Sequence, residues 1–215
     1  MKTDGAIFDL DGTLLDSMGA WDTVACDYLV SCGAVPKPDL KDKIKIMTIK
    51  QAGEYFKSEY GVESTPEKMR EGIGLIMGKF YSEKVEMKPG ADKFLSLLKS
   101  KGIKMCVCSA TERPLVEIAL KRCGLRDYFS GIFSCADVSK GKDSPDVYNL
   151  GLSHLGTDRE NTFVFEDALY ALSTAKSAGF KTVGVRDSSE ACQAELRKIA
   201  DYYITDYESA IELFK

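Results

Sequence analysis

The sequence contains few of the residues from which metal clusters and membrane segments are usually built. It has a single histidine, His154, and no CxxC pair, so a zinc site of cysteine and histidine would have no ligand set. No run of about 18 apolar residues is available to cross a bilayer, and residues 1–5 lack the basic start of a secretion signal. We therefore expect a cytoplasmic protein with no membrane partner.

The cysteine count and the charge exclude two further classes of protein. Seven cysteines cannot all pair, so we expect reduced and mostly buried thiols, and His154 is interpreted as an ordinary packing or surface residue. The formal net charge is −4, whereas proteins that bind nucleic acid usually carry a basic face, so no nucleic-acid partner is expected. A site for an anionic substrate must then be built locally.

The composition is that of a folded globular chain. Of the 215 residues, 44% are hydrophobic and 29% charged, which excludes a disordered or fibrous protein. This length allows one large domain or two small ones. We find no internal repeat and no low-complexity segment.

The first part of the chain predicts one short strand followed by a helical block. Residues 6–8 form an apolar segment that ends at Asp9 and is typical of a buried strand. From Trp21 to residue 85, apolar residues recur at helical spacing. One helix is expected to begin near Pro66, after the capping residues Ser64 and Thr65.

From Gly90 onward, the pattern alternates between helices and strands. The expected helices are 91–101, 113–123, 145–155, 168–178, 189–199 and 207–214. The expected strands are 103–108, 131–134, 162–165, 181–185 and a short one near 203–204. This alternation predicts an α/β fold with a Rossmann-like parallel sheet, which the first strand must join because it cannot be buried alone.

The helical block is therefore an insertion into the α/β domain. The sequence predicts a core domain of residues 1–14 and 90–215, and an inserted α-helical cap domain of residues 15–89. The two connections, near 13–18 and 84–90, would act as a pair of hinges.

Ligands of open α/β sheets bind at the carboxyl ends of the strands, so polar residues there are candidates for chemistry. The first group is Asp9-Leu10-Asp11-Gly12-Thr13, where two carboxylates leave the first strand and Gly12 permits a sharp turn. One carboxylate can be kept protonated while a cation holds the other ionised, as nucleophile and acid/base chemistry needs. An Asp-Gly turn with no chemical role is the alternative.

Three further groups lie at the same predicted edge. Ser109, with Ala110 and Thr111, closes the strand 103–108, and its hydroxyl and the backbone N–H groups could hold an anion. Lys142 precedes a helix start and could neutralise phosphate charge or orient Asp9. Each of these groups also has an ordinary explanation, namely helix capping for the hydroxyls and a solvated loop for the lysine.

The fourth group is Glu166-Asp167, which ends the strand 162–165. Carboxylates at this position often only cap the following helix, but with Asp9 they offer the hard oxygen ligands that Mg²⁺ prefers. Four groups at one edge of one sheet favour a functional site.

Through these motifs the sequence resembles the haloacid dehalogenase superfamily of aspartate-nucleophile phosphotransferases, and the resemblance covers essentially the whole chain. The likeness is to subfamily I, which has a helical cap after the first strand, and to β-phosphoglucomutase and phosphoglycolate phosphatase in particular. The matching motifs are Phe8-Asp9-Leu10-Asp11-Gly12-Thr13, Ser109, Gly141-Lys142 with Pro145-Asp146, and Phe165-Glu166-Asp167.

The resemblance implies a role for each matching residue. Asp9 would be the nucleophile and Asp11 the general acid/base. Ser109, Ala110 and Lys142 would bind the phosphoryl group. Mg²⁺ would be held by Asp9, Asp167, Glu166 and the main-chain carbonyl of Asp11. The implied activity is hydrolysis of small-molecule phosphomonoesters through an aspartyl phosphate.

Several positions depart from the family pattern. Relatives often carry Ser and Gly where this chain has Ala168 and Ala171. Sugar-phosphate mutases carry a cap histidine where this chain has Trp21, and they use an early arginine, whereas the first arginine here is Arg70. Asp11, which the dehalogenases lack, is present, so cleavage of a carbon–halogen bond is not expected.

Two alternatives to the phosphatase stay open. A phosphosugar mutase would pass the phosphoryl group between hydroxyls, and a catalytically idle module would only bind phosphate or protein. Ser17, Trp21 and Lys50 are candidates for cap residues that face the substrate. The partner is expected to be a small phosphate ester, and a monomer is the working expectation.

Overall fold

The computed structural model describes residues 3–44 and 47–214, which separate into two compact units. The core unit comprises the residues up to Ser17 together with those from Val85 onward. The helical unit comprises Met18–Lys84. The helical unit is therefore inserted into the core unit through two linkers.

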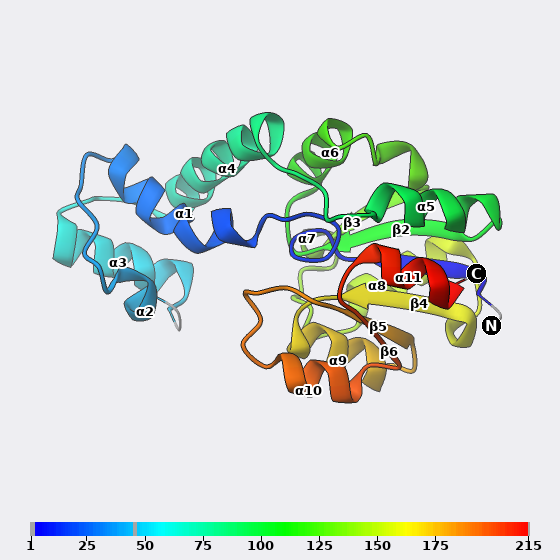
Figure 1. Ribbon diagram of the computed structural model, residues 1–215. Helices are drawn as coiled ribbons and strands as arrows, with labels where there is room; N and C mark the ends of the chain where they lie inside the picture. Colours follow the sequence, from blue (N-terminus) through cyan, green and yellow to red (C-terminus); the bar gives the residue numbers. More distant parts are fainter. Residues whose placement is uncertain (1–2, 45–46, 215) are drawn as a thin grey trace. The chain divides into compact units, whose positions relative to one another are not determined.

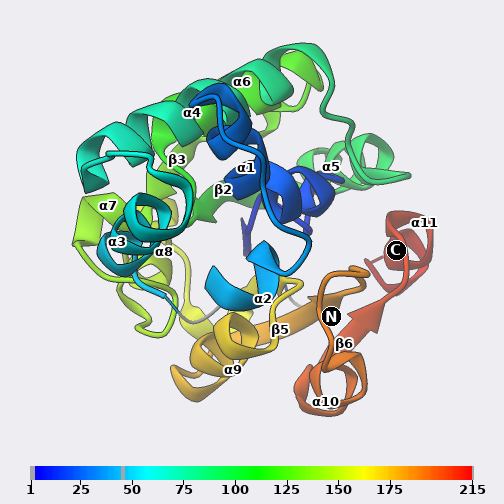
Figure 2. The same cartoon turned by 90° about the vertical axis from the view of Figure 1, so that its left-hand side faces the viewer.

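The core unit is built on a six-stranded sheet in the described part of the chain, and every pairing is parallel. The strands, in chain order, are β1 (Gly5–Phe8), β2 (Lys104–Ser109), β3 (Gly131–Ser134), β4 (Thr162–Glu166), β5 (Lys181–Val185) and β6 (Tyr202–Ile204). Their spatial order is β3-β2-β1-β4-β5-β6, as Figures 1 and 2 show. This confirms the predicted parallel sheet and the place of the first strand in it.

Helices cover both faces of the sheet, because parallel strands need crossover connections. One face carries α5 (Ala91–Ser100), α6 (Arg113–Arg122) and α11 (Tyr207–Phe214), and the other carries α8 (Asp146–Leu155), α9 (Leu169–Ser177) and α10 (Gln193–Ile199) (Figure 1). The connections between these helices and the strands contain three further short turns of helix, namely α7 (Cys135–Val138), η1 (Arg126–Tyr128) and η2 (Arg159–Asn161).

Two details of the predicted helices were wrong. The helix expected over 189–199 begins only at Gln193, because side chains of Asp187 and Glu190 accept hydrogen bonds from the loop's own N–H groups. The helix α7 was not expected, since four residues are too few to show a helical period.

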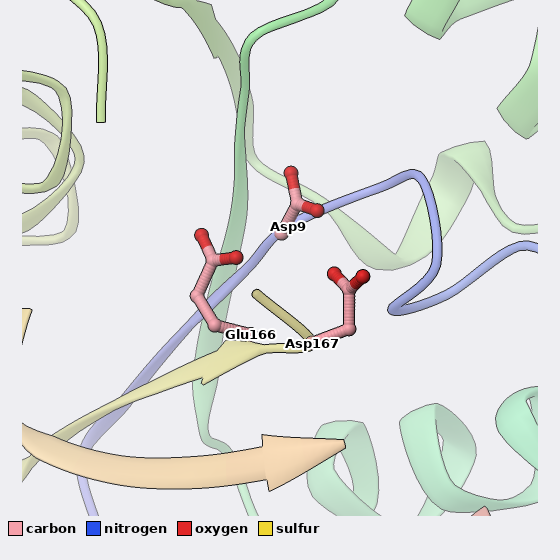
Figure 3. Close-up of side chains that lie close together, drawn as sticks. All are labelled: Asp9, Glu166 and Asp167. Carbon is pink, nitrogen blue, oxygen red and sulfur yellow. The ribbon is translucent and has the colours of Figure 1, made fainter. Parts of the chain in front are cut away.

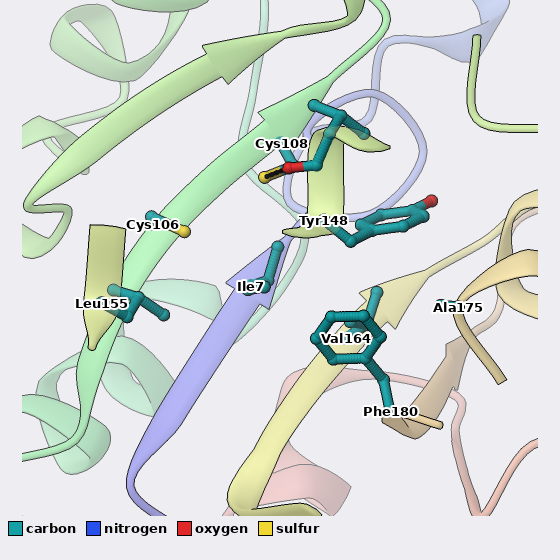
Figure 4. Close-up of a cluster of buried hydrophobic side chains, with 9 residues drawn as sticks. Ile7, Cys106, Cys108, Tyr148, Leu155, Val164, Ala175 and Phe180 are labelled. Atoms are coloured by element: carbon teal, nitrogen blue, oxygen red, sulfur yellow. Dashed lines mark hydrogen bonds between the residues drawn. The ribbon is translucent and has the colours of Figure 1, made fainter. Parts of the chain in front are cut away.

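The two faces of the sheet bury different cores. Alternate residues of a strand point to opposite faces, so Ile7 and Phe8 of β1 enter different clusters. Phe8 stacks on Phe165 at 4.3 Å between ring centroids, beneath α5 and α11. The cluster on the opposite face contains Ile7, Cys106, Cys108 and Tyr148 (Figure 4).

The helical unit consists of α1 (Met18–Ser31), α2 (Leu40–Ile44), α3 (Ile49–Tyr60) and α4 (Pro66–Glu83) in its described part. Its core contains Tyr28 and Phe56, whose rings stack at 6.3 Å between centroids. Thr65 caps α4 by accepting from the N–H of Lys68, and Pro66 occupies the first turn, so this predicted helix start is confirmed.

The linkers lie within the core unit and pair with each other. Leu15 forms an antiparallel bridge to Met87, and Asp16 N donates to Glu86 O at 3.0 Å. The two units meet between residues 17 and 18 and between residues 84 and 85. The boundaries expected from the sequence were 14/15 and 89/90.

The cysteines form no disulfide among the described residues, and all seven are free. Only Cys106 and Cys108 are buried, so the expectation of mostly buried thiols was wrong. None of the described helices combines the length and the apolar character needed to cross a bilayer.

Candidate active site

Three carboxylates meet where the strand order of the sheet reverses direction. Asp9 follows β1, Glu166 is the last residue of β4, and Asp167 comes next. The strands β1 and β4 pair directly, and Asp9 N donates to Phe165 O at 3.0 Å. Such a switch point, at the carboxyl ends of the strands, is where open α/β sheets bind ligands.

The carboxylates of Asp9, Glu166 and Asp167 are close enough to share a cation. One oxygen from each lies within 4.8 Å of the others, and all three residues are buried. Figure 3 shows the three side chains grouped together, with one oxygen of Glu166 and one oxygen of Asp9 on the side that faces Asp167. Oxygen ligands of this type suit Mg²⁺ and similar hard cations.

Lys142 supplies a buried positive charge to this cluster. Its Nζ donates to Glu166 Oε1 at 2.6 Å and also to Asp9 Oδ1. The residue is only 4% exposed, so its ammonium is held by the carboxylates rather than by water. The loop between α7 and α8 places it there, as the sequence predicted for a lysine just before a helix start.

Burial and mutual repulsion disfavour the ionised forms of the carboxylates in this cluster. Burial raises the pKa of Asp9, against the opposing effect of Lys142, and raises the pKa of Glu166 to about 7. Burial and the charges of Asp9 and Glu166 hold the pKa of Asp167 well above its usual range. The pKa of Lys142 is raised because Asp9 and Glu166 together outweigh the effect of burial, which lowers it.

These features fit a divalent cation. Three ionised carboxylates and one ammonium would leave two negative charges in a buried space, a deficit that one divalent ion balances. Asp9, Glu166 and Asp167 are the residues that could hold it.

Asp11 lies outside this cluster and is fixed by two hydroxyls. Ser17 Oγ donates to Asp11 Oδ1 at 2.6 Å, and Thr111 Oγ1 donates to Asp11 Oδ2 at 2.7 Å. Gly12 adopts a left-handed conformation (φ 78°), which lets the chain turn sharply between Asp11 and Thr13. Thr13 Oγ1 then donates to Asp167 Oδ1 at 2.9 Å.

Ser109 and Ala110 lie at the end of β2, in the predicted position. Ser109 is buried, and its Oγ accepts from Thr111 N at 3.0 Å, whereas Ala110 is exposed. The backbone therefore turns tightly here, and Thr111 connects this turn to Asp11.

The three cap candidates do not share one environment. Ser17 belongs to the core unit and is buried against Asp11. Trp21 lies in α1, where its Nε1 donates to Tyr81 at 3.0 Å, and Lys50 is exposed in the first turn of α3.

Tyr148 is a residue of the site that was not expected from the sequence. This residue of α8 is fully buried, and its hydroxyl donates to Glu166 Oε1 at 2.7 Å. Its ring centroid lies 5.9 Å from Lys142 Nζ. In the sequence it is indistinguishable from any apolar-face residue of a helix, so no signal marked it.

The amino-acid sequence is similar to those of known hydrolases and phosphatases. Residues 6–185 match the sequence model of haloacid dehalogenase-like hydrolases. The chain is similar to the phosphorylated carbohydrates phosphatase of Thermotoga maritima, with 26% identity over 84% of this chain and 83% of that protein. It is also similar to the phosphoglycolate phosphatase of Neisseria gonorrhoeae, with 29% identity over 83% of this chain and 78% of that protein.

The fold agrees with a solved structure over nearly the whole length. A provisionally named beta-phosphoglucomutase from Thermotoga maritima superposes with a TM-score of 0.82, at 26% identity and covering 98% of both chains.

Proposed function

The chain belongs to the haloacid dehalogenase-like hydrolase family, and from that membership we propose that it is a Mg²⁺-dependent phosphatase of small phosphomonoesters. The observation that carries this proposal is the buried group of Asp9, Glu166 and Asp167 around the ammonium of Lys142. The names of the similar phosphatases support phosphorylated carbohydrates and small phosphorylated acids as substrates.

Asp9 would be the nucleophile. One of its carboxylate oxygens attacks the phosphorus atom, the bond from phosphorus to the ester oxygen breaks, and an aspartyl phosphate forms. Asp11 donates its proton to the departing oxygen, so an alcohol leaves. Ser17 and Thr111 form hydrogen bonds with its two carboxyl oxygens and hold the side chain in a fixed orientation.

Hydrolysis of the aspartyl phosphate would complete the cycle. A water molecule attacks the phosphorus atom, and Asp11, now ionised, takes its proton. The bond between phosphorus and the Asp9 oxygen breaks, which releases orthophosphate and restores both carboxyl groups to their starting states.

The remaining groups would stabilise negative charge on the transferring phosphoryl group. Lys142 and the Ser109–Ala110 turn, which lie at the same sheet edge as Asp9, would bind the oxygens of the phosphoryl group. Mg²⁺ would be held by Asp9, Asp167 and Glu166, with the main-chain carbonyl of Asp11, and would neutralise charge on the phosphoryl oxygens. The helical unit would serve as the cap that excludes water and selects the leaving group.

A screen of phosphorylated sugars and phosphoglycolate, with Mg²⁺ or with EDTA, tests this proposal. Both orthophosphate and isomerised product are measured, so that a phosphosugar mutase is distinguished from a phosphatase. We expect orthophosphate release that requires Mg²⁺ and is abolished in Asp9→Asn. The matched control is Asp92→Asn, which changes an exposed aspartate in the first turn of α5.

Three outcomes would contradict the proposal. Isomerised product without orthophosphate would identify a mutase. No turnover on any ester would support a module that only binds. Wild-type turnover by Asp9→Asn would show that another group is the nucleophile.

A further inference from the structure

The helix that follows Asp167 lacks a capping group of its own. Ala168 occupies the N-cap position of α9, and its methyl side chain cannot accept a hydrogen bond. The first N–H groups of a helix have no partner within the helix, so they need an acceptor from elsewhere or from water. In α9, the N–H of Leu169 is one of these groups.

Glu190 supplies the acceptor from a distant loop. Its Oε2 accepts from Leu169 N at 2.9 Å, and its Oε1 accepts from Cys192 N at 2.7 Å. Glu190 lies in the β5 loop (residues 186–192), which connects β5 to α10. A carboxylate at a helix N-terminus is favoured by the helix dipole and by charge-assisted hydrogen bonds.

The β5 loop is itself held in place, so Glu190 is presented in a fixed position. Asp187 accepts from the N–H and hydroxyl of Ser189 at 2.9 and 2.7 Å, and from Lys88 Nζ at 2.7 Å. Gln193 Nε2 donates to the carbonyl of Asp187 at 2.6 Å. These bonds lie on both sides of Glu190 in the sequence, and they limit how far its backbone can move.

We infer that Glu190 is a positioning residue for Asp167: it caps α9 from outside and thereby fixes the backbone that leaves β4. Asp167 is separated from the capped N–H of Leu169 by Ala168 alone, so a shift of that N–H moves the Asp167 backbone. The side chain of Asp167 is then aimed by Thr13 Oγ1 at 2.9 Å. This inference rests on the proposed function, because it takes Asp167 as a metal ligand.

Substitutions that remove the outside cap and restore a local one test this inference. The variants are Glu190→Ala, Ala168→Ser and the two combined. Calorimetric titration of the metal-free protein gives the dissociation constant for Mg²⁺, and urea denaturation in EDTA gives the stability. We expect Glu190→Ala to weaken Mg²⁺ binding about tenfold or more, as supporting contacts of metal ligands commonly do.

Rescue by Ala168→Ser is the critical result. A serine at the N-cap can accept from the N–H groups of its own helix, so it should return most of the Mg²⁺ affinity in the Glu190→Ala background. Glu195→Ala is the matched control, since it removes an exposed glutamate from the first turn of α10 and should leave Mg²⁺ binding unchanged. If Glu190→Ala does not fold, Glu190→Gln keeps the size and one acceptor oxygen and should weaken binding less.

The outcomes separate this inference from the proposed function. Unchanged Mg²⁺ affinity in Glu190→Ala, with lower stability alone, would reduce Glu190 to a purely structural role and overturn the inference. Failure of the serine to rescue would also overturn it, because the loss would then not run through the helix cap. Wild-type protein that binds no Mg²⁺ would instead refute the metal site, and the inference with it.

Discussion

Replacement of Lys142 by methionine tests whether buried charge governs this site. Lys142 Nζ donates to Glu166 Oε1 at 2.6 Å and to Asp9 Oδ1, and the side chain is 4% exposed. Methionine has a similar shape and no charge. The substitution therefore keeps the packing and leaves two buried carboxylates without their counter-charge.

The expected loss of stability is large for a single substitution. Removal of one partner from a buried ion pair costs about 3–5 kcal/mol, because the remaining charge is left without compensation. For a chain of this size, about 1 kcal/mol corresponds to a shift in Tm of roughly 2–4 °C, so Tm should fall by roughly 6–20 °C. Added Mg²⁺ should recover part of this loss, since a cation among the carboxylates supplies positive charge.

Urea denaturation near neutral pH, in EDTA and then in Mg²⁺, measures the effect. Lys140→Met is the matched control: Lys140 is 57% exposed and pairs with Asp146 at 3.2 Å, so its loss should cost at most about 1 kcal/mol. If Lys142→Met is as stable in EDTA as the control, the reasoning from buried charge is refuted.

Three further predictions concern stability. In EDTA, the folded pKa of Glu166 (about 7) lies above its ordinary 4.5, so the free energy of unfolding should fall as pH rises from about 4.5 to about 7, and a flat urea-denaturation profile would contradict this. Gly151→Ala would put a Cβ 2.8 Å from Cys108 Sγ and should cost about 1–3 kcal/mol by urea denaturation, whereas Gly74→Ala, in open space, should stabilise. Lys88 and Ser189 stabilise the Asp187 carboxylate and keep its pKa low despite burial. Asp187→Asn should therefore cost about 1.5–3 kcal/mol of stability near neutral pH, and this cost should shrink as pH falls below about 4. A difference that does not depend on pH would argue against the ion pair.

Much of the core unit could be predicted from the sequence because short apolar runs alternate there with segments of helical period. Apolar runs such as 105–108 and 163–165 are too short for helices, and their residues are buried on both faces of the sheet, which favours a covered parallel strand. Helices between them set the parallel direction. The position of Asp9 beside Asp167 then follows from the pairing of β1 with β4.

The residues that support the site could not be predicted, because their signal is spatial. Tyr148 follows the apolar face of a helix, and only the fold shows that its hydroxyl reaches Glu166. Glu190 lies 21 positions from Leu169, in a segment that was predicted to be part of a helix over 189–199. A hydrogen bond between two loops leaves no period in the sequence.

The sequence also could not show which of the two units Ser17 belongs to. It was one of the three candidates for cap residues that face the substrate. The structure buries it in the core unit, with its hydroxyl on Asp11. Local sequence could place it near the linker but could not assign it to one side of the division.

Chemical trapping of the phosphorylated enzyme tests the central claim most directly. The wild-type protein is mixed with Mg²⁺ and a phosphate ester that it hydrolyses, and the reaction is quenched in acid. Reduction with borohydride then converts an aspartyl phosphate to homoserine. We expect homoserine at position 9 in the wild-type chain and unchanged asparagine in Asp9→Asn. Rapid turnover with aspartate intact at position 9, or homoserine at another position, would contradict it.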